Sequence, residues 1–209
     1  MERERITISI KKKVLDSIDK TIDGVSIRNR SHAIETLVSK GLNLNDSKNA
    51  VILIGGKDAI KQIPIVEDNL KLLAKSDYQT VHIAVGFLAS KVKDKLGKGD
   101  KFGLNLKFIE EGEGSGGVLL PLKKVFDKTF LVFNAANNIK GLNLEELFEF
   151  HRQQNIVATI ATDDLTELNG IYVFEPQIFD FIPKDFSMLE SDIFPKVVKE
   201  KQLVIYPLI

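Results

Sequence analysis

The chain has 209 residues, of which 44% are hydrophobic and 28% charged, which is ordinary for a soluble globular protein of one or two domains. Its formal net charge is zero, so no overall field attracts nucleic acid and any basic patch must be local. Cysteine is absent and the three histidines are far apart in sequence, which excludes disulfides and thiolate metal sites and argues against a histidine-rich metal centre.

The first ten residues, "MERERITISI", are charged and alternating, unlike a signal peptide. No apolar run approaches the length that a bilayer span needs. We therefore expect a cytoplasmic protein.

The N-terminal part predicts one strand and two helices. Residues 5–10 alternate polar and apolar side chains, as in a half-buried strand. Apolar residues at helical spacing follow over 14–22, and Gly24 ends that helix. A second helix begins at Ser31, a good N-cap residue. The polar stretch 44–49 is typical of a linker between a domain of residues 1–43 and one of residues 50–209.

The second domain alternates strands with helices. The predicted strands are residues 51–54, 81–85, 104–109, 130–133, 157–161, 170–174 and 203–206, and the predicted helices are 67–75, 88–96, 119–126 and 144–153. This order predicts a Rossmann-like, mostly parallel α/β fold.

The strand "FLVF" at 130–133 is a continuous apolar run, which suits the centre of a parallel sheet covered on both faces. Ligands bind just beyond the carboxyl ends of such strands. The loop that follows, Asn134–Asn138, contains no acid, base or nucleophile. The sequence thus predicts an active-site position without catalytic residues.

One strand and two short helices cannot bury a core alone, and Ile6, Ile8 and Ile10 share one face of the predicted strand. Pairing with the same strand of a second chain would cover them. The segments "RITISI", "KKVLDSIDKTID" and "RNRSHAIETLVSKGL" resemble the ribbon-helix-helix family of prokaryotic DNA-binding proteins. The resemblance implies an intertwined homodimer whose β-ribbon enters the DNA major groove.

The residues assigned to double-stranded DNA are Arg3, Arg5, Thr7, Ser9, Lys11, Arg28, Arg30 and Ser31. Residues 1–49 contain ten Lys and Arg against seven Asp and Glu, a modest excess of the sign that DNA requires. The alternative is that the strand only dimerises and the arginines are solvated.

The second domain is similar, segment by segment and in order, to the sugar-phosphate nucleotidyltransferases. The resemblance rests on "AVILIGGK", "VHIAVGFLASKVKDKLGKGDKFGLNLKFIEEGEGSGGVL", "FLVFNAANNIKGLNLEELFEFHRQQNIVATIA", "NGIYVFEPQIFDFIP" and "FSMLESDIFPKVVKEKQLVIYP". It implies a crevice for a nucleotide, a sugar phosphate or a nucleotide sugar. The candidate ligand-binding residues are Gly55, Gly56, Lys57, Gly114, Ser115, Gly116, Gly117, Asn134, Asn137, Asn138, Asn169 and Glu190.

Several positions depart from the family pattern. Asp58 and Ile60 stand where the family's first loop continues with glycine, threonine and arginine, and Ala136 stands where the family has a metal-binding aspartate. A segment with a phosphate-binding lysine is missing before residue 169. These departures predict no catalytic residue, no metal ligand and no cofactor.

The leading prediction is accordingly a DNA-binding transcription regulator. Its nucleotidyltransferase-like domain would be a catalytically inactive ligand sensor or assembly domain. Two alternatives remain: an active sugar-phosphate nucleotidyltransferase that carries a DNA-binding appendage, and a non-enzymatic oligomerisation or interaction protein.

Overall fold

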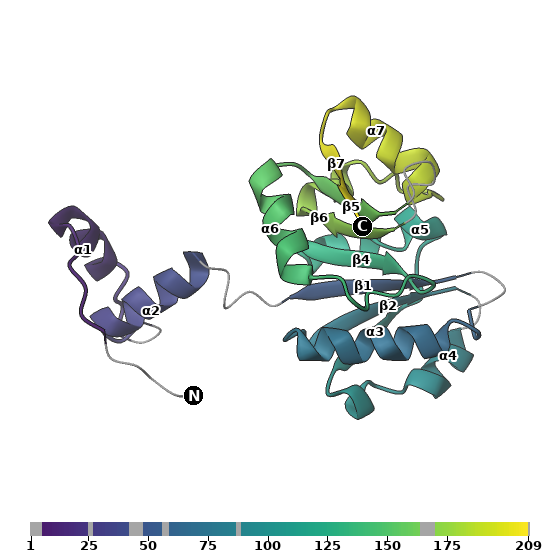
Figure 1. Ribbon diagram of the computed structural model, residues 1–209, viewed down its shortest axis with the longest axis horizontal. Coiled ribbons are helices and arrows are strands. Elements are labelled where there is room, and N and C mark those ends of the chain that lie inside the picture. Colours follow the sequence, from purple (N-terminus) through teal and green to yellow (C-terminus); the bar gives the residue numbers. More distant parts are fainter. Residues whose placement is uncertain are drawn as a thin grey trace. The chain divides into compact units, whose positions relative to one another are not determined.

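The computed structural model describes residues 6–24, 27–41, 48–55, 59–86, 89–163 and 170–208. The chain divides into two compact units, Met1–Asp46 and Ser47–Ile209 (Figure 1). Among the described helices, none has both the length and the low polarity that a bilayer span requires.

The N-terminal unit contains two helices, α1 (Lys12–Asp19) and α2 (Arg30–Gly41). Ile18 and Ala33 are its buried apolar residues within the described ranges. A forked ion pair joins the helices: Arg30 donates from Nε and Nη2 to the two carboxylate oxygens of Asp19, at 2.6 and 2.7 Å. Because this core is so small, the stability of the unit depends on polar contacts and on other groups that cover its exposed apolar side chains.

Three details of this unit differ from the sequence-based expectation. Residues 6–10 are not assigned as a strand, because a single chain supplies no partner strand for them. The first helix ends at Asp19, before Gly24. The cap of α2 is Asn29 rather than Ser31, since the Asn29 side chain accepts a hydrogen bond from the His32 amide at 3.0 Å.

The larger unit is built on one seven-stranded sheet in the order β3-β2-β1-β4-β6-β5-β7. The strands are β1 (Asn49–Ile54), β2 (Thr80–Val85), β3 (Asn105–Ile109), β4 (Phe130–Asn134), β5 (Ala158–Thr162), β6 (Ile171–Phe174) and β7 (Leu203–Pro207). Only β6 runs antiparallel to its neighbours, β4 and β5. The prediction of a mostly parallel α/β sheet is confirmed, and β4 lies at its centre as its apolar sequence indicated.

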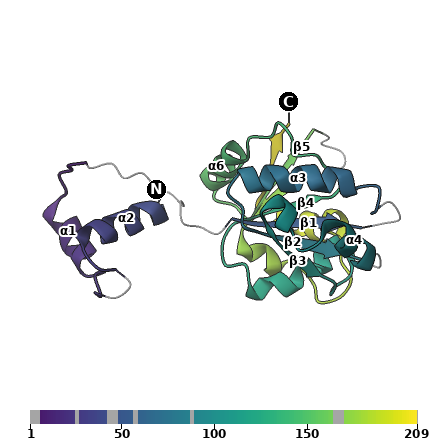
Figure 2. The ribbon, with the colours of Figure 1, turned by 90° about the horizontal axis from the view of Figure 1, so that it is seen from below.

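Helices cover both faces of the sheet (Figures 1 and 2). Successive residues of a strand point to opposite faces, so Ile52 of β1 packs into one core and Val51 into the other. The first core contains side chains of α3 (Ile63–Lys75), α4 (Ala89–Leu96) and α6 (Leu144–Gln154). The second contains side chains of η2 (Leu120–Lys124), η3 (Pro176–Asp180), η4 (Leu189–Ile193) and α7 (Phe194–Lys199).

Two short elements complete the unit, η1 (Asp100–Phe102) and α5 (Gly114–Gly117). The latter corrects the expectation of a Gly-rich turn, because Gly114–Gly117 itself forms a helical turn. The helix predicted at 119–126 is only the 3-10 segment Leu120–Lys124. Helix α3 begins at Ile63, earlier than expected, because a proline is well accommodated in the first helical turn.

Candidate functional site

The carboxyl edge of the sheet contains a topological switch point. From β1 the chain continues to β2 and β3 on one side, and then returns to place β4 on the other side of β1. A crevice outside the carboxyl ends of β1 and β4 is the usual ligand site in such sheets. Gly55 follows β1 there, and Asn134, the last residue of β4, is in register with Leu53. Two of the predicted ligand-binding residues are therefore neighbours at this point.

The antiparallel strand β6 begins at the same edge of the sheet. Ile171, its first residue, pairs with Phe133 near the end of β4 and with Ala161 near the end of β5. Gly170 precedes it, and a Cβ at that position would lie 2.3 Å from the carbonyl oxygen of Ala161. Glycine is thus required where β6 enters the sheet.

The glycine-rich turn α5 lies tightly against the segment around Ser187. The Gly116 amide donates to the Ser187 carbonyl at 2.9 Å. A Cβ on Gly114, whose φ is +76°, would lie 2.2 Å from that same oxygen, and a Cβ on Gly116 would lie 2.3 Å from Ile193 Cδ1. Gly114 is therefore needed for the close approach of two backbone segments, and a side chain on Gly116 would displace the Ile193 side chain, whether or not a ligand lies beside them.

The asparagine-rich loop after β4 is held by hydrogen bonds to two other segments. Asn137 donates from Nδ2 to the Gly170 carbonyl at 2.7 Å. Asn69, fully buried on α3, donates to the Asn137 carbonyl at 2.7 Å and accepts from the Ile139 amide at 3.1 Å. Asn138 accepts from the Lys140 amide at 2.8 Å. The amide side chains of Asn137 and Asn138 thus shape the loop itself, whereas the Asn134 side chain makes no hydrogen bond to another described residue.

Glu190 lies between the glycine-rich turn and β6. Its Oε1 accepts from the Tyr172 hydroxyl at 3.0 Å, and its Oε2 accepts from Ser115 Oγ at 3.2 Å. Burial, together with the negative charge of Glu190, raises the pKa of Tyr172, so this hydroxyl remains a donor at neutral pH.

Sequence reasoning missed Asn69 and Tyr172. A signal for Asn69 was available, because it lies on the apolar stripe of α3 with Val66 and Leu73, at helical spacings of three and four residues. A single amide on an otherwise buried stripe indicates a hydrogen-bonded structural role. Tyr172 lies inside a fully apolar strand and carries no comparable signal.

The structure does not test every predicted ligand residue. Gly56, Lys57 and Asn169 lie outside the described residues, as does Asp58. Of the remaining predicted ligand residues, the contacts above join Ser115, Gly116, Asn137 and Glu190 into one region with Gly170 and Tyr172.

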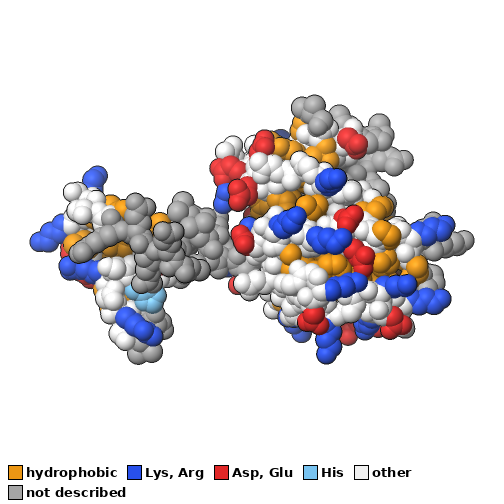
Figure 3. All heavy atoms as spheres, turned by 60° about the horizontal axis from the view of Figure 1, so that its bottom comes forward, with side chains coloured by type: hydrophobic (Ala, Val, Ile, Leu, Met, Phe, Trp, Pro, Cys, Tyr) orange, Lys and Arg blue, Asp and Glu red, His pale blue; other side chains and the backbone are white. Residues whose placement is uncertain are grey.

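Six of the eight residues predicted to contact DNA are described, and they fall into two groups. Arg3 and Arg5 lie outside the described residues. Thr7 and Ser9 are exposed on the unpaired segment 6–10, with Lys11 just before α1. Arg28, Arg30 and Ser31 are exposed at the start of α2, where Arg30 is paired with Asp19. On the face of the larger unit seen in Figure 3, basic and acidic side chains are interspersed.

Among the described residues, this region offers no set of side chains suited to a resident divalent ion. Ala136 is exposed in the loop where the family pattern has a ligating aspartate. Across the described ranges, no three His, Cys, Asp or Glu side chains are grouped so that they could hold a metal. Glu190 is a lone carboxylate whose two oxygens accept protein hydroxyls. We therefore derive no chemical step through a metal.

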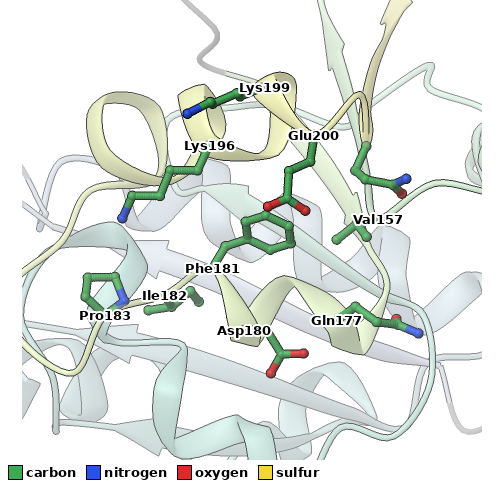
Figure 4. A pocket seen from close by; sticks show the side chains of 10 residues that line it. Val157, Gln177, Asp180, Phe181, Ile182, Pro183, Lys196, Lys199 and Glu200 are labelled. Carbon is green, nitrogen blue, oxygen red and sulfur yellow. The ribbon is translucent and has the colours of Figure 1, made fainter.

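A separate hollow of about 770 Å³ lies away from this edge, among Val157, η3 and α7 (Figure 4). Its lining combines Phe181 and Ile182 with Lys196, Lys199, Glu200 and Asp180, and includes none of the predicted ligand residues. Asp180 is paired there with Lys123. Val157 precedes β5, which places the hollow at the amino end of that strand, opposite to the carboxyl edge with the switch point.

Similarity to known proteins points to one class of enzyme. No protein-family model matches the chain. UTP–glucose-1-phosphate uridylyltransferase of Synechocystis sp. is 28% identical over 188 residues, which cover 66% of this chain and 48% of the relative. Mannose-1-phosphate guanyltransferase 2 of Candida glabrata is 26% identical over 182 residues, which cover 69% of this chain and 50% of the relative. The chain thus spans about half the length of the curated relatives it matches.

Solved structures share the fold. HddC from Yersinia pseudotuberculosis matches with a TM-score of 0.59 at 18% identity, over 71% of this chain and 86% of that one. HddC complexed with GMP-PN matches with a TM-score of 0.58 at 16% identity, over 76% of this chain and 90% of that one. The inositol-1-phosphate CTP transferase from T. maritima matches with a TM-score of 0.58 at 10% identity, over 78% and 86%. The nucleotidyltransferase-like fold is therefore established.

These findings correct the functional prediction. A transcription regulator with a catalytically inactive second domain is contradicted, because the curated relatives above are named as uridylyl- and guanyltransferases and a matching solved structure is named as a CTP transferase. The prediction inferred inactivity from several departures taken together, among them Asp58 and Ile60 in the first loop, Ala136, and the missing segment before residue 169. Motif departures at a few loop positions were weaker evidence than similarity spread over two thirds of the chain. The findings favour the alternative, an active sugar-phosphate nucleotidyltransferase.

Proposed function

We propose that residues 47–209 bind a nucleoside triphosphate and a sugar phosphate at the switch-point crevice, and that the protein transfers the nucleotidyl group to the sugar phosphate. The observation that carries the proposal is the meeting, at one carboxyl edge, of the glycine-rich turn α5, the end of β4 and the beginning of β6. The names of the relatives, which specify uridylyl and guanyl transfer to sugar 1-phosphates, support the same reaction class.

In this reaction an oxygen of the sugar phosphate attacks the α-phosphorus of the triphosphate. The bond from that phosphorus to the bridging oxygen breaks, and pyrophosphate leaves with the electron pair. The chain's contribution is positioning, which is a large part of catalysis in such transfers. Gly55 would offer a backbone amide beside the phosphates, Gly114–Gly117 would flank the base, and Asn134 would bond the ligand at the switch point.

Binding and turnover are tested separately on the full chain. Calorimetry with UTP, GTP, glucose 1-phosphate and mannose 1-phosphate measures binding, and pyrophosphate release with magnesium and each pair of substrates measures transfer. We expect heat with one nucleotide and release with one pair. Heat without release would overturn the transfer reaction and leave the binding site, whereas no heat and no release with any member would overturn both.

The location of the site is tested by two matched variants. Asn134→Ala removes an amide at the crevice, and Gln177→Ala removes one from the separate hollow. We expect Asn134→Ala to weaken nucleotide binding about five- to tenfold, as for one lost hydrogen bond of about 1–1.5 kcal/mol. Gln177→Ala should leave binding unchanged. If Gln177→Ala weakened nucleotide binding and Asn134→Ala did not, the nucleotide site would lie in the hollow.

We also propose that residues 6–10 pair with the same segment of a second copy, in the ribbon-helix-helix manner. The supporting observation is that Ile6 is 73% exposed and Ile8 53% exposed on an unpaired segment. Light scattering of the Ile8→Asp variant should give a monomer, and Thr7→Asp, on the opposite side of an extended segment, should give a dimer. A monomeric native chain would refute the pairing.

A further inference from the structure

An unbroken chain of hydrogen bonds crosses the carboxyl edge of the sheet. It begins on α3, where Asn69 bonds the carbonyl of Asn137. Asn137 bonds the carbonyl of Gly170, and the Gly170 amide donates to the hydroxyl of Tyr172 at 3.2 Å. That hydroxyl donates in turn to Glu190. The loop after β4 and the beginning of β6 are thus tied to one carboxylate.

The chain continues from Glu190 into the glycine-rich turn. Ser115 donates from Oγ to Glu190 and accepts at the same oxygen from the Leu189 amide at 2.8 Å. The Gly116 amide, next along the turn, bonds the carbonyl of Ser187. The position of α5 therefore depends on the segment that carries Glu190.

Glu190 is the junction of the two halves of this network. Each carboxylate oxygen bonds one hydroxyl, one from α5 and one from β6. Bonds from hydroxyls to an ionised carboxylate are about twice as strong as neutral ones, and linked bonds polarise one another. The two hydroxyl-bearing residues are far apart in sequence and have no direct bond to each other among the described contacts. Removing either hydroxyl should therefore change the hydrogen bond that the other hydroxyl makes to Glu190.

We infer that Glu190 is a positioning residue that couples the nucleotide side of the crevice, at Gly114–Gly117, to the sugar-phosphate side, at the beginning of β6. The inference rests on the proposed function, which places the base at Gly114–Gly117, and it adds the assignment of the sugar phosphate to the beginning of β6. Its consequence is a cross-effect: a change confined to one side alters the affinity of the ligand on the other. A purely structural bond would lower stability without this effect on a folded protein.

The cross-effect is tested with hydroxyl deletions on the full chain. Tyr172→Phe removes the bond on the sugar-phosphate side, and Tyr78→Phe removes a hydroxyl from a buried tyrosine just before β2, at the opposite edge. Calorimetry is done where each variant is fully folded. We expect Tyr172→Phe to weaken nucleoside triphosphate binding about fivefold, corresponding to about 1 kcal/mol of coupling. Binding within about twofold of the native value would overturn the inference, and Tyr78→Phe should remain native.

A second measurement needs no ligand. Hydrogen exchange of the Gly116 amide reports on the docking of α5, because that amide is bonded to Ser187. We expect faster exchange there in both Tyr172→Phe and Glu190→Gln, with β1 amides and the Tyr78→Phe variant unchanged. Unchanged exchange at Gly116 would overturn the coupling. If the native chain binds no nucleotide or sugar phosphate, the proposed function fails, and this result still decides whether Glu190 links the two sides.

Discussion

Replacing Asn69 with alanine should destabilise the larger unit and loosen the loop after β4. Asn69 is fully buried, and its amide satisfies two backbone groups that are 68 and 70 residues away in sequence. Alanine leaves the Ile139 amide and the Asn137 carbonyl without this partner. Because the Ile139 bond is buried, water cannot simply replace it.

The magnitude follows from these two groups. A buried polar group that loses its partner costs about 1–3 kcal/mol. The Asn137 bond is only partly buried, so its loss lies at the lower end. We expect a total of about 2–4 kcal/mol. For a unit of this size, each kcal/mol lowers the melting temperature by roughly 2–4 °C, so a loss of 3 kcal/mol lowers it by about 6–12 °C.

Urea unfolding followed by circular dichroism measures the change, with Asp68→Ala as the matched control. Asp68 is the preceding residue of the same helix, exposed and paired only with Lys71 in the described contacts. Its replacement should leave the urea midpoint unchanged, because exposed ion pairs contribute little. A loss below about 1 kcal/mol for Asn69→Ala would refute the view that this amide holds the loop. An equal loss of unfolding free energy in both variants would show that the effect comes from helix α3 and not from the hydrogen bonds of Asn69.

Two further predictions concern the sheet and the glycine-rich turn. Burial, with a smaller contribution from Lys107, lowers the pKa of His82 to about 4, so the folded protein holds a neutral imidazole that the unfolded chain protonates below about 6.5. Stability should therefore fall by up to about 3 kcal/mol as the pH drops from 6.5 towards 4. The urea midpoint should fall less steeply with decreasing pH in His82→Leu than in the native chain. An equal slope would contradict the assignment of this pH dependence to His82. Gly116→Ala should destabilise by about 1–3 kcal/mol through overpacking, whereas Gly55→Ala, with open space around its Cβ, should not. Equal thermal midpoints for these two variants would contradict the close approach to Ser187.

The elements of the larger unit could be predicted from the sequence because each is a local pattern. The run at 130–133 is apolar on both faces, and β4 is indeed central in the sheet. Boundaries shifted where one residue decides them, as at the proline in the first turn of α3. The strand expected at residues 5–10 could not be judged from one chain, since a strand is defined by its partner.

The site was only partly predictable, because its contacts join distant segments. The glycines at 114–117 were expected to approach a ligand, but nothing in their neighbourhood indicated Ser187, more than 70 residues later. Ser115 and Glu190 were both named from the sequence, yet their bond and its link through Tyr172 required the fold. The prediction of inactivity was wrong because it let the combined departures in the loops outweigh the similarity of the whole domain.

The reversed direction of β6 has a consequence for how this fold can vary. Because β6 runs against β5, the connection from Thr162 to Ile171 leaves and re-enters the sheet at the same edge. Lengthening such a turn adds little closure entropy and shifts no strand register. Insertions and deletions between these two strands would therefore alter the edge of the sheet where β5 ends and β6 begins, and leave the layered core untouched. The edge that we propose as the ligand site can therefore diversify, in evolution or by design, independently of folding.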